Sequence, residues 1–219
     1  MQPPDKMLKT LIIGAHGGIG RRLTAKLAAT GIPARAMVRR EEQLSKLRAA
    51  GAEAVPGDLE SDFEHALDGC GAVVFSAGSG AATGPDKTFT VDLWGAIKAI
   101  RACELRGIPR FIMISARNAG DPDSGPASRK PYLIAKHIAD DYLQRSALQY
   151  TILRPGKLTD NPGTGRIRTT RPESADQYIS RDDVADAVVF CLQNPATAGK
   201  TFLLFQGDVP LAEALGAEA

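Results

Sequence analysis

The sequence predicts an α/β protein with a doubly wound parallel sheet, formed by a single domain of residues 1–219. Short apolar runs typical of buried strands alternate with amphipathic segments of helical length along the whole chain. The first apolar run, at residues 9–13, leads into a turn with four glycines at positions 14–20, and a helical pattern follows at once. No long polar or proline- and serine-rich linker interrupts the chain, so we expect one core.

The strands are predicted where apolar residues run together between turn-forming residues. They cover residues 9–13, 33–38, 53–55, 72–75, 110–114, 150–154 and 201–205. Runs that are apolar throughout are typical of parallel strands buried under helices on both faces. Crossover connections then require a helix between successive strands.

The helices are predicted where apolar residues recur every three or four positions and a glycine follows. They begin near Ile19 and Ser180 and cover residues 41–50, 61–67, 87–106, 130–146 and 211–215. Pro131 suits a first turn, and Ser180-Arg181-Asp182-Asp183 resembles a capping box. The apolar face expected for the longest helix comprises Phe89, Leu93, Ile97, Ile100 and Leu105.

Three connections lack a helical or strand pattern. Residues 76–84 are small, and residues 117–128 are polar and long enough to shape the rim of a pocket. Residues 156–177 are expected to be a substrate lid in a small C-terminal substrate-side region. Its basic residues, Lys157, Arg166, Arg168 and Arg171, indicate an anionic or oxygen-rich ligand or, equally, a solvated surface loop.

The composition argues against several classes of protein. Lys and Arg total 27 against 25 for Asp and Glu, and the charges are scattered, so neither a nucleic-acid nor a membrane surface is expected. No apolar run approaches the length of a membrane span, and the start lacks a signal-peptide core. We expect a cytoplasmic protein with a small-molecule substrate, reduced cysteines and no metal site, and the oligomeric state stays open.

The glycine turn is suited to a pyrophosphate. Glycines allow close approach of the backbone, and the helix that follows offers unpaired N–H groups to an anion. Gly14, Arg39, Asp58, Gly78 and Ser115 all end strands or begin the loops beyond them. Since ligands of such sheets lie across the carboxyl ends of the strands, one dinucleotide could touch all five residues. The alternative is a glycine-rich turn without a ligand.

Arg39 follows the second strand, where the ribose of a bound dinucleotide would lie. An acidic residue there pairs with a free 2′-hydroxyl and an arginine pairs with a 2′-phosphate, so NADP is expected rather than NAD. The alternative is a solvated charge at the end of a strand. Asp58 fits either a contact with the adenine or the cap of the next helix.

Ser115, Tyr132 and Lys136 form a possible reaction centre. Tyr132 and Lys136 lie four residues apart on a predicted helix and therefore share a face. The lysine charge is expected to lower the phenol pKa, so that Tyr132 exchanges a proton with a carbonyl or alcohol while Ser115 binds the same oxygen. The alternative is an accidental spacing and a serine that merely completes a strand end.

The chain resembles the atypical short-chain dehydrogenase/reductases, in the NAD(P)-binding, NmrA-like branch. The resemblance is carried by Gly14-x-x-Gly17-x-x-Gly20, Tyr132-x-x-x-Lys136 with Ser115 upstream, and segments 153–156 and 179–185. It implies a Rossmann fold, NADP in the crevice and a Ser-Tyr-Lys site closed by the loop after Pro155. The expected cofactor contacts are Gly14, His16, Gly17, Gly18, Ile19, Gly20, Arg39, Arg40, Asp58, Leu59, Ala77, Gly78, Ser115, Lys136 and Pro155.

Two departures from the family limit the transfer of function. Asp92 stands where better-known relatives carry an asparagine, and no large substrate domain follows the last strand, which disfavours a bulky nucleotide sugar. We expect an NADP-dependent oxidoreductase that acts on a small carbonyl, alcohol or quinone-like substrate. The alternatives are direct hydride delivery to an acceptor, a non-catalytic NADP(H)-sensing regulator and an epimerase-like enzyme.

Overall fold

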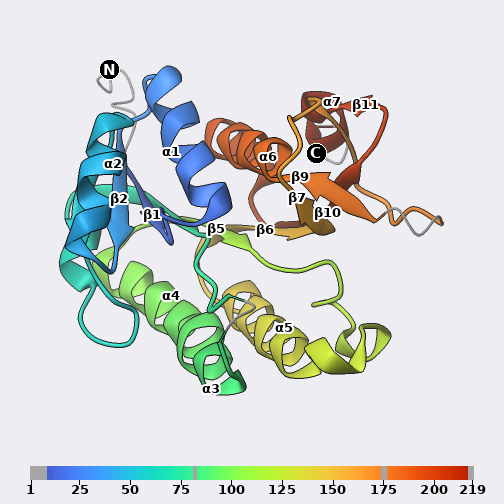
Figure 1. Ribbon diagram of the computed structural model, residues 1–219, viewed down its shortest axis with the longest axis horizontal. Helices are drawn as coiled ribbons and strands as arrows, with labels where there is room; N and C mark the ends of the chain where they lie inside the picture. Colours follow the sequence, from blue (N-terminus) through green and yellow to red (C-terminus); the bar gives the residue numbers. More distant parts are fainter. Residues whose placement is uncertain (1–8, 81–82, 174–176, 217–219) are drawn as a thin grey trace.

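The computed structural model describes residues 9–80, 83–173 and 177–216, and it confirms the α/β fold with a mostly parallel sheet (Figure 1). In these residues the main sheet has nine strands in the order β11-β8-β10-β6-β5-β4-β1-β2-β3. Its strands are β1 (Lys9–Ile13), β2 (Ala34–Val38), β3 (Glu53–Pro56), β4 (Cys70–Phe75), β5 (Arg110–Ile114), β6 (Gln149–Pro155), β8 (Arg166–Arg168), β10 (Lys200–Gln206) and β11 (Val209–Pro210). Strand β8 pairs antiparallel with both β10 and β11, and the other pairings among these described strands are parallel.

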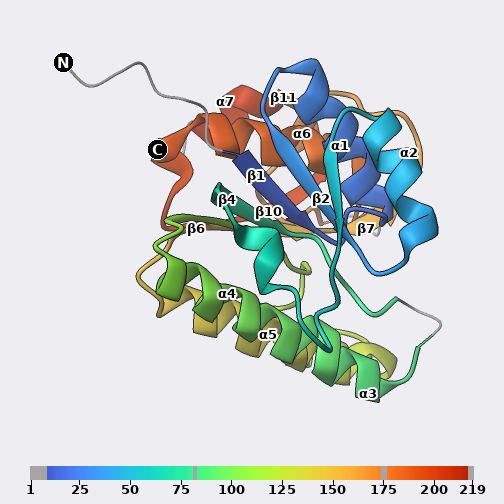
Figure 2. The same ribbon diagram turned by 90° about the vertical axis from the view of Figure 1, so that its left-hand side faces the viewer.

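Helices cover both faces of the sheet (Figures 1 and 2). The first face carries α1 (Gly18–Ala29), α2 (Leu44–Ala49), α6 (Arg181–Gln193) and α7 (Leu211–Gly216), whose apolar residues form one core cluster. Helices α4 (Trp94–Arg106) and α5 (Lys130–Gln144) lie side by side on the second face and share another cluster. The strands are therefore buried on both sides, as their apolar sequences predict.

The position of the ligand crevice follows from the pairing of β1, which lies between β2 and β4 and is parallel to both. The chain leaves β1 through α1 on one face and leaves β4 toward α4 on the other. This is the point at which the strand order reverses, and ligands of open α/β sheets bind there, beyond the carboxyl ends of the strands. The glycine turn after β1 lies at this point.

The prediction of an α-helix at residues 61–67 is wrong. The structure has a 3₁₀ turn at Glu64–Leu67 instead. Asp58 accepts a hydrogen bond from the Glu60 N–H at 2.9 Å, and Asp62 accepts one from the Glu64 N–H at 3.1 Å. Such local side-chain bonds compete with a regular helix.

The long helix contains a π turn that the sequence pattern does not reveal. A first turn at Pro85–Lys87 (α3) continues through a π segment at Thr88–Leu93 into α4. Phe89 and Leu105, both expected in the buried face, are 49% and 86% exposed. The wider π turn rotates Phe89 away from the 3.6-residue period on which the expected face was based, and Leu105 lies in the last turn before Gly107.

The connection at 156–177 is only partly a loop. It contains β7 (Lys157–Thr159), which pairs in parallel with β9 (Tyr178–Ser180), and it contains β8. The buried Asp183 carboxylate accepts hydrogen bonds from the N–H groups of Thr164 and Gly165, at 2.9 and 2.8 Å. Tertiary contacts thus hold this segment against the start of α6.

The cysteines, the hydropathy of the helices and the start of α6 can also be compared with the sequence predictions. Cys103 and Cys191 are buried free thiols and Cys70 is half-buried. In the described ranges, no helix has the length and hydropathy to cross a bilayer.

Ser180 caps α6 as expected, because its Oγ accepts from the Asp182 N–H at 3.0 Å and donates to the Asn161 carbonyl at 2.6 Å.

Ser180→Ala removes both of these bonds and is expected to lower the free energy of unfolding by about 1 to 2 kcal/mol. Urea denaturation followed by circular dichroism measures the change. Ser45→Ala, at an exposed position in α2, serves as the control and is expected to change stability by less than about 0.5 kcal/mol. Equal effects of the two substitutions would contradict the capping role.

Candidate functional site

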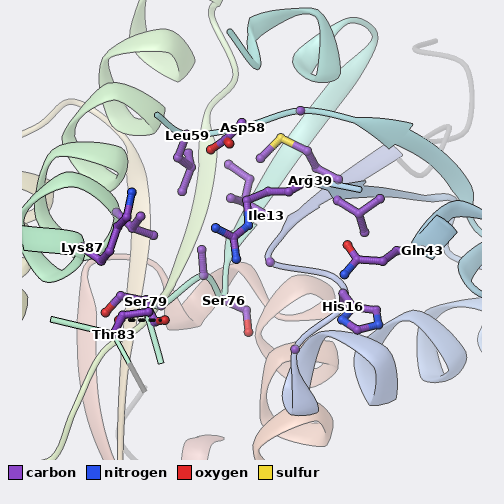
Figure 3. Close-up of a pocket in the computed structure, with 18 residues that line it drawn as sticks. Ile13, His16, Arg39, Gln43, Asp58, Leu59, Ser76, Ser79, Thr83 and Lys87 are labelled. Atoms are coloured by element: carbon purple, nitrogen blue, oxygen red, sulfur yellow. Dashed lines mark hydrogen bonds between the residues drawn. The ribbon is translucent and has the colours of Figure 1, made fainter. Parts of the chain in front are cut away.

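Two adjoining cavities lie at the carboxyl ends of β1 and β4. The first, of about 270 Å³, extends from the glycine turn past the end of β2 (Figure 3). The second, of about 820 Å³, extends from the same turn toward α5. Residues common to both linings are Gly17, Ser76, Ala77, Gly78, Ser79 and Thr83. Together the cavities form one crevice across the switch point of the sheet.

The glycine turn lies where the two cavities meet, and its geometry suits an anion. Gly17 caps α1 without any side-chain hydrogen bond, and the first turn of α1 holds no acidic residue. A Cβ on Gly14, where φ is +87°, would lie 2.6 Å from the Ala77 nitrogen, and one on Gly20 would lie 2.4 Å from the Gly14 oxygen. Glycine is therefore required at both positions, and the open N–H groups at the start of α1 fit a pyrophosphate.

Arg39 extends from the end of β2 into the first cavity, beside Ile13 and Ser76 (Figure 3). Among the described residues, its guanidinium has no hydrogen bond or ion pair. His16 and Gln43 line the same cavity. The pKa of His16 is lowered, first by burial and then by the charges of Arg21 and Lys46, so the surroundings are positive. A phosphate group would be stabilised there.

Asp58 and Leu59 line the first cavity, as expected. The Asp58 carboxylate also accepts the Glu60 N–H, so it closes a turn at the rim of the cavity. Arg40 does not line either cavity. It is exposed, and its nearest carboxylate is that of Glu42 at 3.5 Å. The two adjacent arginines thus have different surroundings, which makes Arg40 a natural control for Arg39.

Asp92 is almost fully buried and lines the second cavity. Its Oδ2 accepts a hydrogen bond from the Ser79 N–H at 2.9 Å, and its Oδ1 lies against Gly78. The π turn between residues 88 and 93 brings this carboxylate to the loop after β4. Asp92 therefore positions the loop that separates the two cavities, in a way that the sequence does not indicate.

Tyr132 and Lys136 both line the second cavity, on the same face of α5. Lys136 is 1% exposed, and its Nζ donates to the Ile114 carbonyl at 2.8 Å and lies 5.7 Å from the centre of the Phe75 ring. Burial lowers the pKa of Lys136, against the opposing charges of Asp92 and Asp140.

The pKa of Tyr132 is raised rather than lowered as expected, and Lys136 is not among the groups that shift it. Burial, followed by the nearby charge of Asp92, raises the pKa of Tyr132 to about 12. The guanidinium of Arg129, 4.9 Å from the ring centre of Tyr132, offsets this only in part. The lysine ammonium is held by a backbone carbonyl, and a buried phenol resists ionisation. Tyr132 is therefore a protonated phenol at neutral pH.

Ser115 lies at the end of β5 in a buried network. Its Oγ donates to Asp140 Oδ2 at 2.8 Å, and the same oxygen accepts from Arg154 Nε at 2.9 Å. Asp140 is 1% exposed, and burial raises its pKa despite the neighbouring charges of Lys136 and Arg154. Since the serine proton is directed to Asp140, the oxygen lone pairs of Ser115 remain for a ligand.

Arg181 lines the crevice, although the sequence analysis named it only in a helix start and in the family segment 179–185. It lines the second cavity, and its side chain covers Gly18 so closely that a Cβ there would lie 2.7 Å from Arg181 Cδ. Its guanidinium pairs with Asp160 at 3.0 Å, and Arg22 pairs with the same carboxylate at 3.2 Å. The sequence offers no direct signal for this role, because Arg181 is far from the glycine turn along the chain and only the fold brings it to Gly18.

The structure brings most of the expected cofactor contacts to this crevice. Its linings include Gly14, His16, Gly17, Gly18, Ile19, Arg39, Asp58, Leu59, Ala77, Gly78, Ser115 and Lys136. Gly20 and Arg40 do not line it, and Pro155 lines a third cavity next to Ser115. A Rossmann-type sheet with a glycine anion seat at its switch point defines a dinucleotide-binding protein.

Comparison with known proteins supports this class. The NAD(P)H-binding family matches residues 14–195, and the chain belongs to this family as an atypical short-chain dehydrogenase/reductase. It is 48% identical to an uncharacterized sugar epimerase, YhfK, of Bacillus subtilis (strain 168), over 95% of this chain and 99% of that protein.

Two solved structures show the same fold. A putative NAD-dependent epimerase/dehydratase from Bacillus halodurans has 45% identity and a TM-score of 0.92, with 96% of this chain and 99% of that chain covered. The anaerobillin reductase ChuY from Escherichia coli O157:H7 has 26% identity and a TM-score of 0.78, with 92% and 98% covered.

Gly20→Ala would push a methyl group against the backbone of the glycine turn, because the added Cβ lies 2.4 Å from the Gly14 oxygen. We expect the affinity for nicotinamide dinucleotide to fall at least about tenfold, as measured by calorimetry. Gly216→Ala, where a Cβ meets nothing within 4 Å, is the control and should bind as the native protein does. Native affinity in Gly20→Ala would place the pyrophosphate elsewhere.

Proposed function

We propose that this protein is an NADP-dependent oxidoreductase that acts on a small carbonyl, alcohol or quinone-like substrate, in the direction of carbonyl reduction. The observation that carries the proposal is the second cavity, which holds Ser115, Tyr132 and Lys136 beside the glycine turn. A volume of about 820 Å³ leaves room for a substrate beside a nicotinamide. ChuY, named as a reductase, supports the reaction class by similarity.

The chemistry needs a hydride and a proton. The reduced nicotinamide supplies the hydride to the carbonyl carbon when it is bound. The protonated Tyr132 donates a hydrogen bond to the carbonyl oxygen and then transfers its proton to that oxygen. A phenolate with a pKa of about 12 takes a proton back readily from solvent, so the acid is regenerated for the next cycle.

Ser115 and Lys136 have supporting roles in this proposal. Because Ser115 directs its proton to Asp140, its oxygen accepts a hydrogen bond from the hydroxyl of the alcohol product. Lys136, fixed to the Ile114 carbonyl, places a positive charge near the oxygen that gains electron density during reduction. Neither residue needs to transfer the proton itself.

The preference for NADP over NAD is proposed from Arg39, which extends into the first cavity and has no ion pair with any described residue. Arg39→Ala is expected to weaken NADP binding at least about tenfold and to leave NAD binding within about twofold, because only NADP carries the 2′-phosphate. Calorimetric titration measures both affinities. Arg40→Ala is the matched control. A native preference for NAD would refute the cofactor assignment.

Tyr132→Phe removes the proton donor while keeping the ring. The expected result is a loss of about 100-fold or more in kcat for aldehyde or quinone reduction, with NADPH affinity within about twofold of the native value. Tyr142→Phe removes a hydroxyl from the same helix that accepts a bond from Arg101, outside the cavities, and is the control. Unchanged turnover in Tyr132→Phe would instead favour direct hydride delivery.

The rate of reduction should depend little on pH over the neutral range. Tyr132 stays protonated below its raised pKa, so the active form is lost only as the pH rises toward about 12. A profile of kcat between pH 6 and about 10 is expected to lack an alkaline decline assigned to Tyr132. A decline near pH 7 that disappears in Tyr132→Phe would show that the phenol ionises much more easily.

The second candidate is a non-catalytic NADP(H)-sensing regulator. The raised pKa of Tyr132, together with Asp92 in place of the usual asparagine, favours it, because both oppose a proton relay through Lys136. Such a protein would bind NADPH without oxidising it in the presence of aldehydes, quinones or flavins. An epimerase-like activity, suggested by the name of the Bacillus subtilis relative, would return the nicotinamide to its starting state without net oxidation.

A further inference from the structure

A third cavity, of about 220 Å³, adjoins the second cavity at Ser115 and Tyr132. The residues that line both the second and the third cavity are Ser115, Arg129, Tyr132, Leu158 and Arg181. Residues after β6 also line the third cavity. Its charged lining residues are Arg117, Arg129, Lys157 and Arg181. No carboxylate lines it in the part of the chain that the structure describes.

Most of these charges lack a carboxylate partner. In the described ranges only Arg181 forms an ion pair, with Asp160. Arg117 donates to the Gln177 carbonyl at 2.9 Å, and Arg129 lies over the ring of Tyr132. The pKa of Arg117 is lowered by burial and then by the charges of Arg171 and Arg129, a sign of crowding between like charges. Such an arrangement is stabilised by an added anion.

The other basic residues of segment 156–177 have structural partners, so the cavity is not merely part of a generally basic surface. Arg166 donates to the Asp208 carbonyl, and Arg168 lies 3.5 Å from the Asp208 carboxylate. Arg171 donates to the Arg117 carbonyl at 3.3 Å and holds the loop that carries Arg117. Of the four basic residues in this segment, Lys157 is the one that reaches the cavity.

We propose that the third cavity binds an anionic group of the substrate, a carboxylate or a phosphate, while the carbonyl of the same molecule lies at Tyr132. This inference rests on the proposed function, because it places one end of the substrate at the reaction centre. Arginine guanidiniums bind such oxyanions through paired N–H groups, and the lysine adds a point charge. The sharing of Ser115 and Tyr132 between the cavities limits the substrate to a compact molecule with its charge near its carbonyl.

The test compares aromatic aldehydes that differ in charge but keep the same ring. The probes are 4-formylbenzoate, (4-formylphenyl)phosphonate and the neutral methyl 4-formylbenzoate. Each is titrated by calorimetry into the full-length protein saturated with NADP⁺, in which no hydride is available and binding is read without turnover. The variants are Lys157→Gln and Arg117→Gln, and Arg145→Gln, a largely exposed cation at the end of α5, is the control.

We expect at least one anionic aldehyde to bind tenfold or more tightly than the ester in the native protein and in Arg145→Gln. The tighter of the two anions identifies the group for which the cavity is suited. In Lys157→Gln and in Arg117→Gln the preference should fall to threefold or less. The native preference should also fall between 50 and 500 mM NaCl, because salt screens the charges.

The proposal is overturned if neither anion binds better than the ester, or if both variants keep the full preference. Circular dichroism of Arg117→Gln separates loss of fold from loss of charge, and Lys157→Gln, at an exposed position, gives an independent result. Failure of the proposed function has a different signature. A preserved anion preference without NADPH oxidation would refute the oxidoreductase, whereas turnover with equal affinities for acid and ester would refute the anion cavity.

Discussion

The close approach of two backbone segments determines the rest of this site. At the switch point of the sheet the turn after β1 touches the chain after β4, with room for hydrogen but not for a methyl group between Gly14 and Ala77. This contact brings the start of α1 beside the loop of residues 76–79, and both cavities open from there. The shape of both cavities therefore depends on this one steric contact between two backbone segments.

Buried charge is the second constraint. Asp92, Lys136 and Asp140 are all nearly inaccessible, and each has a bond that fixes it: to the Ser79 N–H, to the Ile114 carbonyl, and to Ser115 with Arg154. Removing such groups from water is costly unless they are bonded and balanced by neighbours of opposite charge. The balance here keeps Tyr132 protonated, so the electrostatics favour an acid rather than a base at this position.

The sequence predicted the fold and the crevice well because both depend on local patterns. Apolar runs predict strands buried on both faces, and closely spaced glycines after the first run predict a tight turn into a helix. The 3₁₀ turn at Glu64–Leu67 was missed because Asp58 and Asp62 bond to nearby N–H groups, which periodicity does not report. The ionisation of Tyr132 was misjudged because its pKa is raised by burial and by the charge of Asp92, and both depend on tertiary packing that the spacing of Tyr132 and Lys136 does not report.

The π turn at Thr88–Leu93 has a consequence for how related sequences are compared. The π turn adds one residue to the helix without interrupting it. Residues after the turn are therefore rotated by about 100° about the helix axis, the rotation of one α-helical residue, relative to an uninterrupted α-helix. Deleting one residue there would turn Lys87 away from Glu60, whose carboxylate it now contacts at 2.8 Å. An alignment to a relative with an uninterrupted helix therefore needs a gap in this segment, and the residue matched to Asp92 depends on where that gap is placed.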